Sequence, residues 1–134
     1  MTFVLHRDQG LPCVAASNIA ANVPVKLVTG GSGQMLVIPA ATSTDEILGF
    51  THAVATQGDA VAVHGPFAIV KAIAAASLGQ GPVGIASTNG ALGPISGASG
   101  FVKKAVGDSV GPAAPGETFS VYVNSRQLSD GGAI

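Results

Sequence analysis

Short apolar runs separated by glycine- and proline-rich turns recur along the whole chain. Glycine adopts positive φ and proline fixes φ, so both residues favour chain reversals. Apolar runs that such turns bound at regular intervals are typical of antiparallel sandwiches and barrels. A chain of 134 residues is enough for one hydrophobic core. We therefore predict an all-β protein, a small antiparallel β-barrel or sandwich with extended N- and C-terminal arms and at most one short helix.

The apolar runs predict the strands and the domain boundaries. The predicted strands span residues 3–6, 23–29, 35–38, 47–55, 60–64, 67–75, 83–87, 101–105 and 118–124. We predict residues 1–21 as an N-terminal arm or edge segment, residues 22–124 as the β-barrel or sandwich domain, and residues 125–134 as a C-terminal tail or arm.

One segment allows two structures. From Phe67 to Leu78 the content of Ala, Leu and Lys would support a short helix that ends at Gly79. Bulky and small side chains alternate at its start, which favours a strand.

Two turn signals stand out. Asn89 followed by Gly90 predicts a type I′ hairpin, because that turn needs positive φ at both central residues. Glycine followed by a carboxylate occurs at Gly58, Gly107 and Gly116. This local repeat predicts one turn-to-strand device used more than once, with the valines or phenylalanine that follow pointing inward at period two.

Charge and cysteine content narrow the possible partners. Six basic and seven acidic residues make up 10% of the chain, with a formal net charge of −1. Nucleic-acid affinity needs several clustered cations, so we expect no nucleic-acid partner. No apolar run reaches the length of a membrane helix, and the first residues lack a signal peptide, so we expect no membrane partner. A surface so poor in charge favours subunit contacts.

The chemistry-bearing residues do not form a recognisable catalytic motif. No two histidines have the i, i+4 spacing of a helical metal site, and Cys13 is the only cysteine. The segment TSTDE at residues 42–46 is predicted as a polar turn. We expect no enzyme activity and no catalytic, cofactor-binding or metal-binding residues. A site assembled from His52, His64 and Asp59 is the least favoured alternative.

Four segments carry a resemblance to a known family. They are VPVKLVTG at residues 23–30, ILGFTHAVATQGDAVAVHGPFAIVKA at residues 47–72, GPVGIASTNGALGPIS at residues 81–96 and KAVGDSVGPAAPGETFSVYVN at residues 104–124. Their order resembles the tailed-bacteriophage head decoration, or capsid cement, proteins of the small β-barrel kind. The resemblance implies a virion protein on the outer capsid surface, made in the host cytoplasm, that staples neighbouring capsomers of the major capsid protein and stabilises the head without catalysis or cofactors.

The same resemblance implies a homo-oligomer, a trimer or a dimer. Local threefold points between capsomers are natural docking places, which favours the trimer. Extended termini can add to the sheet edge of a neighbour, so Phe3, Val4 and Leu5 at one end and Ile134 at the other are candidate capsid or subunit contacts. The alternative is a carbohydrate- or host-surface-binding β-module, which would need exposed aromatic rings from a chain that has few.

Overall fold

The structure, a computed structural model, describes residues 10–28, 34–42, 45–87, 89–95 and 103–128. The described residues form ten strands and no helix, which confirms the all-β fold class. The ambiguous segment after Phe67 forms a strand. The strands are β1 (Leu11–Ala15), β2 (Pro24–Val28), β3 (Leu36–Pro39), β4 (Gly49–Thr51), β5 (Ala60–His64), β6 (Ile69–Ile73), β7 (Gly81–Ile85), β8 (Leu92–Pro94), β9 (Lys103–Ser109) and β10 (Thr118–Leu128).

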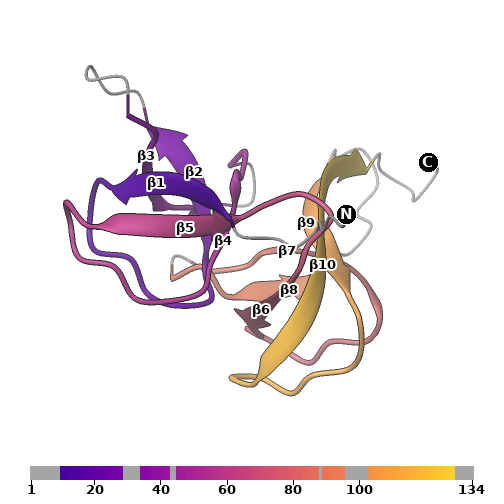
Figure 1. The fold of residues 1–134 in the computed structure, drawn as a ribbon. Helices are drawn as coiled ribbons and strands as arrows, with labels where there is room; N and C mark the ends of the chain where they lie inside the picture. The colour runs from indigo at the N-terminus through magenta and orange to yellow at the C-terminus, as the bar shows by residue number, and fades with distance from the viewer. Residues whose placement is uncertain (1–9, 29–33, 43–44, 88, 96–102, 129–134) are drawn as a thin grey trace, which may run out of the picture.

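The strands form two units that follow each other along the chain (Figure 1). Strands β1 to β5 close a barrel in the order β1-β3-β2-β4-β5, and every neighbouring pair is antiparallel except β1 with β3. Strands β6 to β10 form a sheet in the order β6-β10-β9-β7-β8. The fold therefore contains two five-stranded units where the sequence predicted one domain.

Period-two alternation explains why the strands β5 and β10 form. In β5, Val61 and Val63 are buried, while Ala60 and Ala62 between them are exposed. The following unit repeats the pattern with Phe119, Val121 and Val123 of β10 in its core. The alternation predicted after two of the glycine–carboxylate pairs is thus confirmed.

The two units are copies of one motif, because the same backbone hydrogen bonds recur at matching positions. Ile19 and Ala55 exchange N–H···O bonds of 2.8 and 2.9 Å in the first unit, and Leu78 and Ala113 exchange bonds of 2.8 and 3.1 Å in the second. The backbone N–H groups of Gly58 and Gly116 each donate to an alanine carbonyl, to Ala15 and Ala74 respectively, at 2.8 Å.

The prediction of a third turn of this kind, at Gly107, is wrong. Gly107 and Asp108 lie inside β9, and Gly107 matches Gly49 of β4 in the other unit. A Cβ on either glycine would collide with a carbonyl oxygen of the adjacent strand, at His64 for Gly49 and at Tyr122 for Gly107. These two glycines are therefore required by close backbone approach and not by a turn.

Strands extend beyond residues 22 and 124, the predicted limits of the β-domain. Strand β1 lies in the predicted N-terminal arm but pairs with both β3 and β5, and Ile19 belongs to the core of the barrel. Pro12 within β1 interrupted the alternation, so the strand was not predicted. At the other end, β10 continues to Leu128. The predicted strand at residues 3–6 lies outside the described residues.

The hairpin around Asn89 forms, but not with the predicted turn type. β7 pairs antiparallel with β8, and the N–H of Gly90 donates to the carbonyl of Ser87 at 3.1 Å. Gly90 has φ of 87°, and because its N–H closes the turn onto Ser87, Gly90 is the last residue of the turn and not one of its two central residues. The Asn89 side chain instead accepts hydrogen bonds from the Ser87 hydroxyl and from the N–H of Ala91. The local side-chain bonds thus select a different turn.

Phe50 joins the two units. It is fully buried and belongs to β4 of the first barrel, yet its side chain packs in the core of the second unit together with Ala40. An ion pair of 2.6 Å between Lys104 of β9 and Glu46 also links them. The two units therefore share an apolar junction.

Candidate interaction surface

Three large apolar side chains lie exposed on the second unit, where they form what we call the aromatic patch: Phe67, Ile69 and Tyr122. Their exposed fractions are 69%, 67% and 37%. Ile69 of β6 is paired directly with Tyr122 of β10, so both side chains share one face of the sheet. The rings of Phe67 and Tyr122 lie 6.2 Å apart between centroids. Clustered exposed apolar side chains are a mark of interaction sites.

Phe67 is held in place at a cost in backbone energy. It has φ of 67°, a left-handed conformation that is rare for a bulky residue. Its N–H donates to the carbonyl of Val123 at 2.7 Å, which fixes the segment between β5 and β6 against β10. A strained residue with an exposed aromatic ring is a candidate for binding.

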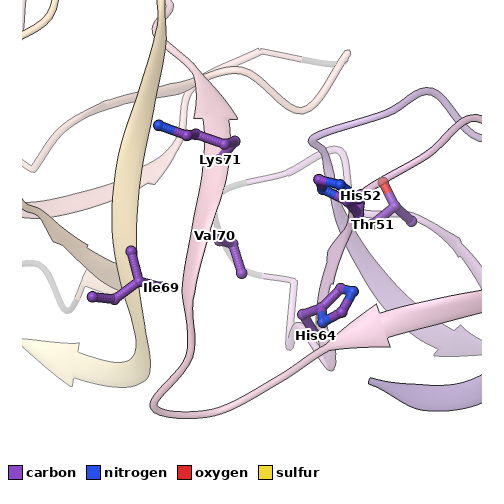
Figure 2. Close-up of a pocket in the computed structure, with 6 residues that line it drawn as sticks. All are labelled: Thr51, His52, His64, Ile69, Val70 and Lys71. Carbon is purple, nitrogen blue, oxygen red and sulfur yellow. The ribbon is translucent and has the colours of Figure 1, made fainter. Parts of the chain in front are cut away.

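A groove of about 380 Å³ lies beside the patch, between the two units (Figure 2). One wall consists of Thr51, His52 and His64 from the first barrel, and the other of residues 69–71 of β6. The rings of His52 and His64 meet edge to face, with centroids 6.1 Å apart. Figure 2 shows Val70 pointing toward the histidines, whereas the other two β6 side chains point away.

A separate cluster of polar contacts surrounds Asp45, in the segment between β3 and β4. Its carboxylate accepts hydrogen bonds from Lys26 Nζ at 3.0 Å and from the backbone N–H groups of Ala41 at 2.9 Å and Thr42 at 3.1 Å. Partial burial alone would raise the pKa of Asp45, but the Ala41 N–H and the Lys26 ammonium outweigh it and hold the pKa well below its usual range. Through these bonds Asp45 connects the residues that follow β3 to strand β2.

The structure brings together only part of the least favoured catalytic alternative. His52 and His64 are neighbours, but Asp59 lies at the other end of β5, about 16 Å along the strand from His64. Asp59 instead accepts the N–H of Thr56 at 3.0 Å within its own turn. Among the described residues, no group of three or more His, Cys, Asp or Glu could hold a metal ion. Burial raises the pKa of the Cys13 thiol.

The predicted contacts Phe3, Val4, Leu5 and Ile134 lie outside the described residues. The aromatic patch was not predicted from the sequence, because the candidate contacts were placed at the two ends of the chain. A signal was present in β10, where Tyr122 stands between Val121 and Val123 and so points to the opposite face.

The comparison with solved structures shows a likeness over most of the chain. The fold is similar to that of the N base of the head fiber protein gp8.5 of bacteriophage phi29, with a TM-score of 0.67. The sequences are 16% identical, and the match covers 85% of this chain and 92% of the other. No protein-family model and no curated protein matches the sequence. Within the described residues, the structure has no helix that is long and apolar enough to cross a membrane.

Proposed function

We propose that this chain is a structural protein of a phage head, which binds the outer surface of the shell and staples neighbouring capsomers of the major capsid protein. The fold likeness to a phage head fiber base carries the proposal. The order of motifs in the sequence, which resembles that of capsid decoration proteins, supports it independently of that likeness. The protein would then act as part of the virion, after synthesis in the host cytoplasm.

The aromatic patch is the surface that we assign to this contact. Aromatic side chains in a compact apolar cluster are the usual anchors of protein interfaces. The strained backbone of Phe67 keeps one of these rings exposed. A staple also gains from several weak contacts acting together, so we propose that the chain docks as a homo-trimer, with a dimer as the alternative.

Binding to shells tests the proposal. Expanded shells of the phage that encodes the chain, prepared without it, are sedimented with the purified wild type. Saturable co-sedimentation is expected. Light scattering of the free protein gives its oligomeric state. A wild type that stays in the supernatant with intact expanded shells would show that the capsid assignment is wrong.

A matched pair of variants tests the patch. Phe67→Asn removes the ring, and asparagine tolerates the left-handed conformation, so the variant should fold. Val54→Asn is the control, because Val54 is 75% exposed and lies in the first barrel, outside the patch. We expect Phe67→Asn to weaken shell binding about 30-fold, as for an interface hot spot, and Val54→Asn to bind as the wild type does. Equal binding by both variants would exclude the patch from the contact.

A carbohydrate- or host-surface-binding module is the second candidate. The two exposed rings of Phe67 and Tyr122 favour it, because sugar sites use such aromatic surfaces. A glycan array probed with the wild type and Phe67→Asn would test it. Binding that the variant loses would support a glycan site, and an array without signal would reject it.

A further inference from the structure

Strand β6 has one edge that no other described strand covers along residues 69–71. These residues pair with β10 only. The carbonyl of Ala68 accepts the N–H of Val123 in β10 at 2.8 Å, so the peptide groups of even-numbered residues in this segment face β10. Antiparallel strands direct the peptide groups of alternate residues to opposite edges. The backbone N–H and carbonyl groups of Ile69 and Lys71 therefore point away from β10.

These edge groups have no hydrogen-bond partner within the part of the chain that the structure describes. Figure 2 shows the pale yellow β10 on one side of β6 and the histidines of the groove, His52 and His64, on the other. An open strand edge beside a groove is a template for the addition of an extended segment, because main-chain bonds provide affinity and the groove accepts side chains.

The matching edge of the first unit is blocked. Ala15 of β1 corresponds to Ala74 of β6, because the carbonyl of each accepts the N–H of the glycine in the equivalent turn. Counting back three residues, Pro12 of β1 stands where β6 carries Lys71. Proline has no N–H to donate to an added strand. The open edge is therefore a property of the second unit alone.

Lys71 gives this edge a charge that the chain itself does not neutralise. Lys26, Lys104 and Arg126 each form an ion pair with a carboxylate. The ammonium of Lys71 instead donates to the Ser120 hydroxyl at 3.1 Å, and within the described residues it has no carboxylate partner. An added segment that carries an acidic side chain would be complementary to this edge.

The same charge disfavours a second copy of this chain as the added strand. Two copies that used both edge residues would pair Ile69 of one with Lys71 of the other. That register sets each ammonium opposite an apolar side chain and brings the two lysines into diagonal contact. Lysine on an edge strand is a common means of preventing such pairing.

We propose that β6 receives an extended segment of the major capsid protein as an added strand, with an apolar side chain opposite Ile69 and a carboxylate opposite Lys71. These two side chains lie on the face of the aromatic patch, because residues opposite each other in a sheet share a face. The residue between them enters the groove beside Val70. The inference rests on the proposed function and names the part of the shell protein that the chain contacts.

Substitutions at Lys71 test the added strand by co-sedimentation with expanded shells. Lys71→Pro removes the edge N–H without removing a bond to β10, and Pro12 shows that the fold accommodates proline at the matching position. We expect this variant to bind shells at least about 30-fold more weakly than the wild type. Lys71→Gln keeps the edge N–H and loses only the charge, so we expect a loss of about 2- to 5-fold. Lys71→Arg keeps both and is the matched control, which should bind as the wild type does.

Each outcome separates this inference from the proposed function. Wild-type binding that Lys71→Pro retains in full would overturn the added strand and leave the shell contact in place. A wild type that does not bind shells would overturn both. Light scattering tests the second copy, since a free oligomer that Lys71→Pro dissociates would mean that this edge pairs with another copy and not with the shell.

Amide hydrogen exchange of the wild type tests the added strand without any substitution. Exchange proceeds on the shells and is quenched, and mass spectrometry with fragmentation at single residues then measures it. Shell binding should slow exchange at Ile69 and Lys71 at least about ten-fold, because their N–H groups gain partners. The amides of Val70 and Ala72 already face β10 and should keep their rates. Unchanged exchange at Ile69 and Lys71 in shell-bound protein would overturn the proposal.

Discussion

Asp45 illustrates how one carboxylate secures a loop in a chain with few charges. Its side chain is 13% exposed and gathers an ammonium and two backbone N–H groups. Because these partners prefer the ionised form, the folded state holds the pKa of Asp45 below the value of about 4 expected when the chain is unfolded. These hydrogen bonds therefore contribute most to the free energy of unfolding when the carboxyl group is ionised.

We predict that Asp45→Asn lowers the free energy of unfolding by about 1 to 2 kcal/mol at pH 7, because bonds to a charged group become neutral ones. The sign of the pH dependence follows from the depressed pKa. The stabilisation is complete above about pH 4 and is lost progressively as the pH falls toward and through the folded pKa, so the difference between the variant and the wild type should be smaller at pH 2 than at pH 7.

Urea denaturation at both pH values measures this difference. Glu46→Gln is the control, since Glu46 makes an ion pair on the surface that contributes little. A loss at Asp45→Asn that is equally large at pH 2 and pH 7 would contradict the assigned cause.

For individual residues, the sequence predicted the type of local structure more reliably than the contacts that each side chain makes. The polar turn at residues 42–46 was expected, but the ion pair of Asp45 with Lys26 joins this segment to strand β2, and only the folded sheet brings the two together. The exposure of Tyr122 could be predicted from the alternation of side chains alone. The exposure of Phe67 could not, because it depends on a positive φ that no local pattern predicts for phenylalanine.

Among the elements, the turns before β5 and β10 are built alike. In each, a carboxylate accepts a backbone N–H three residues earlier, Asp59 from Thr56 at 3.0 Å and Glu117 from Ala114 at 2.8 Å. The carboxylate fixes the turn and the glycine before it adopts positive φ. The turns therefore share a mechanism as well as a sequence pattern.

We predict that Asp59→Ala and Glu117→Ala each reduce the free energy of unfolding by about 1 kcal/mol, the net value of one hydrogen bond. Asp59→Asn and Glu117→Gln keep an acceptor oxygen and should lose less. Thermal denaturation of the four variants measures the effect. Full stability in both alanine variants would mean that the glycines alone determine the turns.

Strand prediction succeeded where alternation was clean and failed where it was broken. The bounds predicted for β5 agree with the structure, because its valines and alanines alternate without interruption. Strand β1 was missed because proline interrupts it, and its burial comes from pairing with β3 and β5, which are distant in sequence. Pairing with distant strands therefore stabilises β1, although its local sequence does not favour a strand.

For the whole molecule, the junction at Phe50 determines how the two units hold together. The side chain leaves its own barrel and fills the core of its neighbour. Phe50→Ala is predicted to lower the free energy of unfolding by about 3 to 5 kcal/mol, from lost burial and the cavity left behind. Amide exchange should accelerate in both units, because each contributes to the same junction.

Phe67→Ala is the control, since its ring is exposed and its loss should change stability by less than about 0.5 kcal/mol. An effect of Phe50→Ala that is confined to the first barrel would show that the units are energetically independent. Sequence analysis predicted the all-β class from turn spacing. The division into two units was not predicted, because the repeat keeps only a few glycines and carboxylates in common.

The likeness of the two units creates a hazard during folding, since a strand of one half can be mistaken for its counterpart in the other, a common failure of repeated domains. The positions of Phe50 and Asp108 work against this error. Asp108 in β9 stands where β4 carries Phe50, and it is held by a bidentate pair with Arg126 at 2.8 and 3.1 Å. If the two strands exchanged places, a carboxylate would enter the apolar junction without its guanidinium, at a cost of several kcal/mol. The difference between Phe50 and Asp108 thus disfavours the pairing of β4 or β9 with the wrong unit.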